Sequence, residues 1–552
     1  MSHTTAERIV RSGVVVIIAH AIIMLAGVVQ NAVLGHYFAS VELDAFIIAF
    51  EGILYLAFLV GEGAIGPAFL PVFNAALSRG DERAAWQFAN GLLSIQNLIL
   101  AVLVPVFMLW PAWVVRIVNG MIGQPNLPVP TAQDAFIADI LRYMGPGLIG
   151  MFLGTTTYKI LNGYKRFFWA AIGDTVTKAA VIGFVLLLCD PHAAAAFHPR
   201  AVMALGLGVA VGGFGKLAIH ILGFRDKVPL LLSTRPAVRT PEFRTFLLLV
   251  APLLLGIVFA KVRDFINNII LLRLVDIDGI VAAHSYGAKL FKTIGRLVPY
   301  AISLAMLPYF CDMVDRNDRQ ALGAFMSRAS RMLLLFFFPL AIGAAVLSHP
   351  MVRIIFAHGK FNLTDWVATA NICYVLVLPF YSLEYFFMQG FFADRRTVAP
   401  VVLGIASSAL AILLGYLAVA VFKVHLIWGP VAAIVAVAGS YVLSRIIKIA
   451  LFIHFFRKNV PVFTEPDFAR FLLKVLVVTA ITGLCAAGML HMPGPIGALV
   501  RTGGRMRQLL GLALAVMAGG AGFLAAVRFL RFEEFDLAFH WALEKVRRRR
   551  AP

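Results

Sequence analysis

Apolar segments long enough to cross a membrane follow one another along almost the whole chain. We count about fourteen of them in the 552 residues, and a helix needs roughly 20 apolar residues to span the hydrocarbon core. The composition agrees, since 61% of the residues are hydrophobic and only 14% are charged. Soluble globular proteins of this size are far less apolar. The sequence therefore predicts an all-α polytopic membrane protein with about 14 transmembrane helices and no sizeable soluble domain.

The basic residues indicate the orientation of the chain. The formal net charge is +20, which in a soluble protein would suggest a nucleic-acid partner. In a membrane protein the simpler source is a set of basic cytoplasmic loops, so we expect no nucleic acid. With the N-terminus inside, the clusters on the cytoplasmic side include Arg79 and Arg83, Lys165 and Arg166, Arg225 to Arg239, Arg316 to Arg331, Arg395 and Arg396, and Arg547 to Arg550. Both termini are therefore predicted to be cytoplasmic.

An internal repeat divides the chain at an offset of 237 residues. Four matched pairs of segments share this offset: 69–73 with 306–310, 79–81 with 316–318, 115–117 with 352–354, and Gln30-Asn31 with Asn267-Asn268. The offset covers six of the apolar segments, an even number, so the two halves keep the same orientation. This arrangement is typical of transporters built from parallel repeats.

The repeat predicts four parts of the chain. Residues 1–224 would form an N-lobe of helices 1 to 6, and residues 244–457 a C-lobe of helices 7 to 12. The basic, proline-interrupted stretch 225–243 would link them along the cytoplasmic surface. Residues 458–552 would add helices 13 and 14 and a basic cytoplasmic tail.

Cationic side chains inside two neighbouring apolar segments mark a candidate binding site. They are Lys261, Arg263, Lys289, Lys292 and Arg296. A charge at the centre of a bilayer costs at least about 2.5–3.5 kcal/mol, so such side chains face a protein interior or a water-filled cavity. Lys289, Lys292 and Arg296 are spaced i, i+3, i+7 and so share one helical face. The pattern indicates an anionic ligand, with snorkelling to the interface as the alternative for Arg296.

Each of three carboxylates inside apolar segments has two interpretations. Glu62 lies in a Gly61–Ala64 break of the second helix, as a hinge or ion-coupling group or as a buried hydrogen-bonding partner. Glu51 would couple protons or pair with a lysine of the C-lobe. Asp264 would form a structural ion pair with Lys261 or exchange partners during transport, and Arg263 should point about 100° away from Asp264.

Further charged residues lie in apolar segments, and two of them are interpreted as a pair. They are Asp174 and Lys178, which are spaced i, i+4 on one helix and should pair on one face. Lys159, Lys216, Glu384, Arg445 and Lys448 are also expected to be buried or interfacial.

Enzymatic chemistry finds no support in the sequence. The four cysteines, Cys189, Cys311, Cys373 and Cys485, have neither disulfide-framework nor metal-ligand spacing. The histidines are scattered singly, and no P-loop, Gly-x-Ser-x-Gly or Cys-x-x-Cys motif occurs. We therefore expect a transporter rather than an enzyme, with no metal and no cofactor.

Several short motifs resemble those of the MurJ/MviN family of lipid II flippases, in the MOP exporter superfamily. The matching segments are Asp44-Ala45-Phe46 with Ala49-Phe50, Glu62-Gly63-Ala64, Ala68-Phe69-Leu70-Pro71, Leu307-Pro308 and His358-Gly359-Lys360-Phe361. The resemblance covers nearly the whole chain. It implies two six-helix lobes in a V around a central cavity, alternating access, and a groove beside the last two helices for the lipid tail.

The chain departs from this family where cavity arginines are expected. By the resemblance, Met24, Gln30 and Ala57 take the places of arginines on the first two helices. The cavity arginine of the eighth helix falls on Lys289. We therefore hypothesise that the C-lobe provides most of the positive charge. Substrate binding is assigned to Lys289, Lys292, Arg296, Lys261, Arg263, Gln30 and Asn31, and gating or coupling to Glu62, Glu51, Asp264 and Asp44.

The resemblance implies a monomeric flippase in the bacterial inner membrane. Its substrate would be a polyprenyl-diphosphate-linked glycan, moved from the cytoplasmic to the outer leaflet. Lipid II, the precursor of peptidoglycan, is the first candidate. An O-antigen or exopolysaccharide precursor is the alternative, and a non-transporting scaffold with the same fold is a third possibility, against which the density of buried charge argues.

Overall fold

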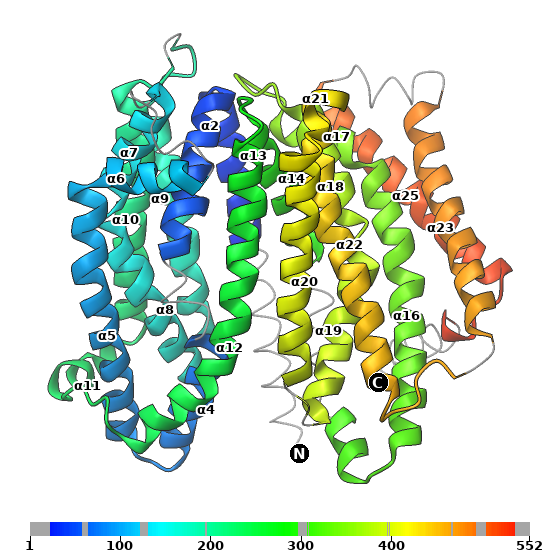
Figure 1. The fold of residues 1–552 in the computed structure, drawn as a ribbon, viewed down its shortest axis with the longest axis horizontal. Coiled ribbons are helices and arrows are strands. Elements are labelled where there is room, and N and C mark those ends of the chain that lie inside the picture. The colour runs from blue at the N-terminus through cyan, green and yellow to red at the C-terminus, as the bar shows by residue number, and fades with distance from the viewer. Residues whose placement is uncertain are drawn as a thin grey trace, which may run out of the picture. The chain divides into compact units, whose positions relative to one another are not determined.

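The computed structural model describes residues 22–57, 65–121, 131–193, 196–295, 306, 309–394, 396, 398–464, 467–492 and 504–535. Over these residues the fold is all-α, without a strand (Figure 1). Among the described residues, eight helices are long and apolar enough to cross a membrane, or up to eleven when each bent pair counts as one span. The predicted all-α polytopic fold is confirmed, and the count of fourteen stays a prediction.

The chain forms two compact units. Unit 1 comprises Met1–Ala282 and Phe356–Leu363, and unit 2 comprises Ala283–Ile355 and Thr364–Pro552. Unit 1 begins with the helix Ile22–Tyr37, which precedes α2 (Ser40–Ile47), η1 (Ile48–Leu54), α4 (Ile65–Ser78), α5 (Glu82–Leu109), α6 (Pro111–Met121), α7 (Ala132–Met144), α8 (Gly147–Gly163), α9 (Phe167–Leu188), α10 (Pro199–Gly223), η2 (Arg225–Lys227), α11 (Val228–Ser233), α12 (Pro241–Phe265), η3 (Ile266–Ile270) and α13 (Leu271–Arg273).

Helix α14 (Ile280–Gly295) leads into unit 2. The helices that follow are α16 (Arg319–Val346), α17 (Ser348–Phe356), α18 (Thr364–Val375), α19 (Leu378–Ala393), α20 (Val398–Tyr416), η4 (Leu417–Val421), α21 (Val424–Trp428), α22 (Pro430–Arg457), α23 (Phe468–His491) and α25 (Arg505–Phe529). The lobe and linker boundaries inferred from the repeat remain predictions.

Glycines allow α8, α9 and α10 to pack backbone against backbone in unit 1. A Cβ atom on Gly150 of α8 would lie 2.1 Å from the carbonyl carbon of Gly213 in α10. On the other side of α10, a Cβ on Gly212 would lie 2.8 Å from Cα of Thr177 in α9. Thr177 Oγ1 also donates to the carbonyl of Gly212 at 3.1 Å. Such small-residue contacts replace the hydrophobic driving force that lipid does not supply.

The internal repeat is visible in the backbone of one turn in each unit. Helix α5 begins after Asp81, whose carboxylate accepts from Ala84 N at 2.9 Å. Helix α16 begins after Asp318, whose carboxylate accepts from Ala321 N at the same 2.9 Å. Both helices have 28 residues and an internal proline. The preceding residues, Gly80 and Asn317, both have left-handed φ angles, +78° and +54°. The repeat is thus confirmed in this turn and in the helix that follows it.

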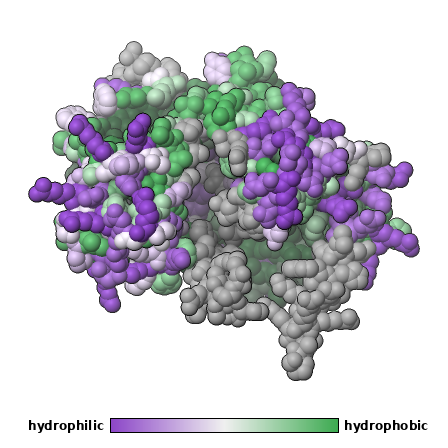
Figure 2. Space-filling model, turned by 90° about the horizontal axis from the view of Figure 1, so that it is seen from below, coloured by the Kyte–Doolittle hydropathy of each residue, from purple (hydrophilic) through white to green (hydrophobic). Residues whose placement is uncertain are grey.

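Within unit 1, the segment between α10 and α12 is anchored to α5. Asn90 Nδ2, on α5, donates to the carbonyls of Leu231 at 2.9 Å and Thr234 at 2.8 Å. Glu242 at the start of α12 pairs with Arg79 at 2.9 Å. Seen from below, this end of unit 1 carries mainly hydrophilic side chains (Figure 2). The exposed arginines there include Arg83, Arg225, Arg235, Arg239 and Arg244.

Candidate functional site

Lys289 lies on α14 in unit 2 and is half-buried. Its ammonium lies 5.3 Å from the ring centroid of Tyr286, one turn earlier on the same helix. His284 and Phe291 fix α14 against α18, because His284 Nε2 is 2.9 Å from the Tyr374 hydroxyl and the Phe291 ring stacks on Tyr374. The backbone of α14 also includes Lys292, which supports the predicted helical spacing. The side chain of Lys292, and Arg296 as a whole, lie outside the described residues.

The cations predicted on the preceding helix belong to unit 1. Lys261 Nζ lies 4.1 Å above the ring of Tyr55, a cation–π distance. Arg263 is buried, and its Nη2 donates to Asp264 Oδ1 at 2.6 Å. The prediction that Arg263 points away from Asp264 is therefore wrong. A guanidinium on a long stem can fold back across the 100° that separates adjacent residues on a helix.

Two π-helical segments flank these residues, and no residue pattern predicted either of them. Segment η1 contains the half-buried Glu51, and η3 follows directly after Asp264 and Phe265. They face each other in unit 1, because a Cβ on Gly52 would lie 3.4 Å from the Ile269 side chain. π-Helical turns are rare and occur frequently at functional sites. Their position next to Glu51 and Asp264 makes this pair of segments a candidate for local rearrangement.

Asp44 is buried on α2 and accepts two backbone hydrogen bonds. The donors are Gly279 N at 2.7 Å and Ala282 N at 2.6 Å, at the first turn of α14. A carboxylate at this position satisfies N–H groups that have no partner within a helix and complements the helix dipole. Gly279 has a φ of +86°, a conformation that favours glycine. The contact joins residues of unit 1 that are more than 230 positions apart.

Of the remaining predicted site residues, the structure describes Gln30 and Asn31 but not Glu62. Asn31 is buried and Gln30 is half-buried on the helix Ile22–Tyr37. Glu62 and the Gly61–Ala64 break lie outside the described residues, which resume at the start of α4.

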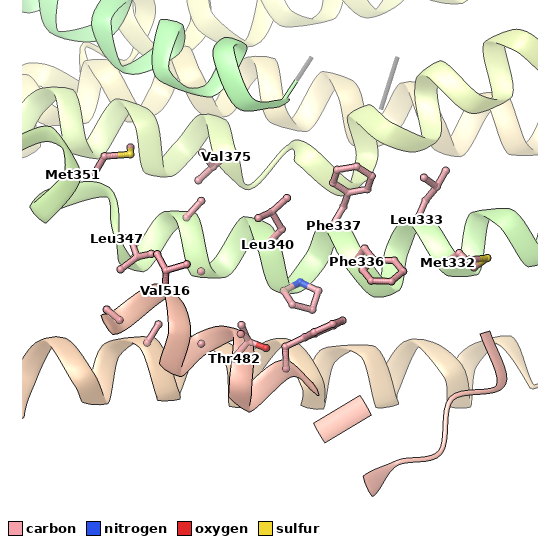
Figure 3. Close-up of a pocket in the computed structure, with 18 of the residues that line it drawn as sticks. Met332, Leu333, Phe336, Phe337, Leu340, Leu347, Met351, Val375, Thr482 and Val516 are labelled. Carbon is pink, nitrogen blue, oxygen red and sulfur yellow. The ribbon is translucent and has the colours of Figure 1, made fainter. Parts of the chain in front are cut away.

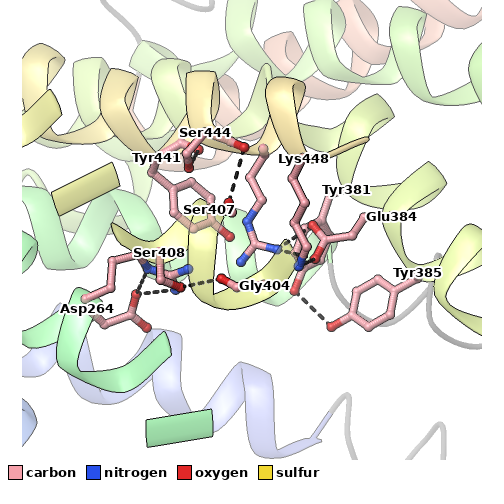
Figure 4. A network of polar contacts seen from close by, with 12 residues as sticks. Asp264, Tyr381, Glu384, Tyr385, Gly404, Ser407, Ser408, Tyr441, Ser444 and Lys448 are labelled. Atoms are coloured by element: carbon pink, nitrogen blue, oxygen red, sulfur yellow. Dashed lines mark hydrogen bonds and ion pairs between the residues drawn. The ribbon is translucent and has the colours of Figure 1, made fainter. Parts of the chain in front are cut away.

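Two ion-pair clusters, one partly exposed and one buried, include partners that the sequence did not predict. In unit 1, Asp174 pairs with Lys216 of α10 at 2.6 Å. In unit 2, Glu384 of α19 pairs with both Arg445 and Lys448 of α22, with Lys448 Nζ at 2.6 Å (Figure 4). The i, i+3 spacing of Arg445 and Lys448 was the available signal, since it places both cations on one face of a helix.

An apolar cavity of about 750 Å³ lies in unit 2, between α16, α23 and α25 (Figure 3). Its lining extends from Met332 and Leu333 to Leu347 and Met351. Along a helix, the 15 steps from residue 332 to residue 347 span about 22 Å. Its walls are almost entirely aliphatic and aromatic, so the cavity suits a hydrocarbon chain.

The fold defines the class of protein, a polytopic membrane protein with the fold of known transporters. A solved structure titled "Lipid II flippase MurJ, inward closed conformation" matches with a TM-score of 0.69 and 20% identity. The match covers 94% of this chain and 99% of that one. An inward-facing multidrug transporter of the MATE family in the same superfamily matches with a TM-score of 0.61 and 10% identity, over 79% of this chain and 95% of that one.

The sequence narrows the class to one family. The family described as "Lipid II flippase MurJ" matches residues 34–502, so the chain belongs to the MurJ family. A probable lipid II flippase MurJ of Bdellovibrio bacteriovorus is 24% identical over 95% of this chain and 93% of that protein. One of Haemophilus influenzae is 26% identical over 83% of this chain and 88% of that protein. The predicted family and the prediction of a multi-pass bacterial membrane transporter, rather than an enzyme, are confirmed.

Proposed function

We propose that this protein moves lipid II from the cytoplasmic to the outer leaflet of the bacterial inner membrane, with both termini in the cytoplasm. Membership of the MurJ family over residues 34–502 is the observation that carries the proposal. The protein acts as a monomer and needs no nucleic acid. Its substrate has two parts with opposite requirements, a charged diphosphate with its glycan and a long hydrocarbon tail.

The charged part sets the energetic problem. An isolated charge transferred into hydrocarbon costs tens of kcal/mol in the Born limit, so a bare diphosphate does not cross about 30 Å of lipid. Ammonium and guanidinium groups lower that cost through charge-assisted hydrogen bonds. Lys289 is the central group in this role, since it is half-buried on α14 and backed by the rigid His284–Tyr374 contact. Lys292, Arg296, Lys261 and Arg263 add positive charge.

Two neutral polar residues are also assigned to the substrate. Gln30 and Asn31 supply hydrogen bonds without charge, from a helix of unit 1. The apolar cavity beside α23 and α25 supports the binding of the tail, because it presents about 750 Å³ of space and none of its described lining residues is charged. The headgroup and the tail are thus bound by separate parts of the protein.

The gating role rests on the carboxylates. Asp44 joins α2 to the first turn of α14 through two short hydrogen bonds, so release of this contact would free α14. Glu51, Glu62 and Asp264 act as negative partners of the cations when substrate is absent. An anionic substrate that competes for those cations binds the two states of the alternating-access cycle with different affinities. A ligand can shift a conformational equilibrium only through such a difference.

Rescue of cells tests the proposal. A bacterium depleted of its own lipid II flippase should grow when it expresses this chain, and should not grow with the Lys289→Ala variant at the same membrane abundance. Lys458→Ala is the matched control, because Lys458 is an exposed lysine at the end of α22. The contrary result is that the wild-type chain does not support growth of this bacterium but rescues a strain that lacks an O-antigen or exopolysaccharide flippase. That result would assign the alternative substrate.

A further inference from the structure

Unit 1 contains a lysine cluster that the proposed function leaves unused. It lies between α8, α9 and α10. Lys216 of α10 is committed to Asp174 of α9, with its Nζ 2.6 Å from Asp174 Oδ1. The stem of Lys216 passes over Gly154 of α8, where a Cβ would lie 2.9 Å from Lys216 Cε. The glycine leaves room for the stem, so this pair is built into the packing of the three helices.

A second lysine, Lys178, follows Asp174 by one turn on the same face of α9. Lys178 acts electrostatically on Asp174 as well. Two ammonium groups thus act on one carboxylate, and the three residues together carry one excess positive charge. The Asp174 side chain is 36% exposed, so the cluster borders an open surface of unit 1 rather than a closed core.

The side chain of Lys178 extends to the helix Ile22–Tyr37. Its Cε lies 3.3 Å from the position that a Cβ on Gly27 would take. Glycine at this position is therefore what allows the lysine stem to cross the helix closely. Gly27, Gln30 and Asn31 are spaced i, i+3, i+4 and share one helical face. Lys178 consequently reaches the face of this helix that carries the two neutral polar side chains assigned to the substrate.

We propose that Lys178 is a binding residue for the anionic diphosphate of the substrate in unit 1. It supplies the positive charge that Gln30 and Asn31 lack, and the Lys216–Asp174 pair positions α9 behind it. This inference rests on the proposed function and revises the hypothesis that the C-lobe provides most of the charge. A lysine suits the role, since its ammonium is a compact charge with three donors on a flexible stem.

Binding of lipid II to the full-length protein in nanodiscs tests the inference. Lys178→Gln and Lys178→Ala should bind lipid II at least about tenfold more weakly than the wild type, which corresponds to about 1.4 kcal/mol. Lys178→Glu should bind more weakly still, and Lys178→Arg should keep most of the affinity. Lys458→Ala, which removes an exposed lysine from unit 2, should bind as the wild type does.

Two readouts separate charge from folding. The melting temperatures of Lys178→Gln and the wild type should agree, because the Lys216–Asp174 pair is intact in both. Raised salt should weaken binding by the wild type more than by Lys178→Gln, since the variant has one charge fewer in the contact. If the wild type binds lipid II and a folded Lys178→Gln variant binds it with equal affinity, this inference is overturned and the proposed function stands. A wild-type protein that binds no polyprenyl diphosphate overturns the proposed function and this inference together.

Discussion

The carboxylate of Asp44 accepts a hydrogen bond from the backbone N–H of Gly279 at 2.7 Å, across 235 residues of sequence. Ala282 N donates to the other carboxyl oxygen, so α14 begins against a fixed hydrogen-bond acceptor. An ionised or strongly accepting side chain at this point stabilises the first turn of the helix that carries Lys289. The position of a candidate substrate residue therefore depends on contacts seven and ten residues earlier, at the start of the same helix.

Asp44→Ala removes both hydrogen bonds and leaves two buried N–H groups without their partner. We expect a loss of about 1–3 kcal/mol in stability and a clear loss of transport. Asp44→Asn keeps one acceptor and should have an intermediate effect. Thermal unfolding and flipping by the purified variants would measure both. Wild-type stability and transport in Asp44→Ala would remove this contact from the account.

The tail cavity predicts a separation between headgroup and tail. Gly343 lines the cavity and a Cβ there has no atom within 4 Å, so Gly343→Phe should fill the space without disturbing the fold. Binding of lipid II should weaken, whereas binding of an analogue with a short chain should be unchanged. Gly439→Phe is the control, because Gly439 has the same open surroundings and does not line the cavity. Equal effects of the two substitutions would contradict a role for the cavity.

Glu384 is the counter-charge of two buried cations, and its loss should be costly. Glu384→Gln leaves Arg445 and Lys448 without their carboxylate, and removal of one partner of a buried pair costs about 3–5 kcal/mol. A marked fall in melting temperature is expected. The double variant Glu384→Gln/Lys448→Met should recover part of it, because one of the two uncompensated charges is gone. An unchanged melting temperature in the single variant would show that the cluster is not important for stability.

Asp81 and Asp318 cap helices of equal length in equivalent turns of the repeat. Replacement of either by alanine should cost about 0.5–2 kcal/mol, and Asp→Ser at either position should cost less because serine also caps. Urea unfolding of the variants would measure these losses of stability, with the accessibility of the cysteines in each unit as the readout. A clear cost at one aspartate and none at the other would contradict the equivalence of the two turns.

The fold was predictable from the sequence wherever a residue pattern is local. The apolar segments specify helices, and the offset of 237 located the turn before α5 and the turn before α16 through Arg79-Gly80-Asp81 and Arg316-Asn317-Asp318. Left-handed residues and capping aspartates are short-range features, so a repeat in sequence becomes a repeat in backbone.

The polar pairing was less predictable, because it depends on which helices become neighbours. Asp174 has Lys178 one turn away, but the structure adds a second partner, Lys216, because glycines in α9 and α10 bring α10 against α9. Arg263 folds back onto Asp264 although the helical angle predicts otherwise. The π-helical segments η1 and η3 have no local signature. The packing of Gly52 against Ile269 shows that the two segments face each other.

The most direct test of the account is the transfer of lipid II across the bilayer of liposomes that contain the purified protein. Lipid II in the inner leaflet should become accessible to a reagent in the outer solution with the wild type and with Lys458→Ala. Lys289→Ala, folded and reconstituted at the same density, should lose most of that activity. Full transfer by Lys289→Ala would contradict the role of Lys289, and no transfer by the wild type would contradict the assignment of lipid II as the substrate.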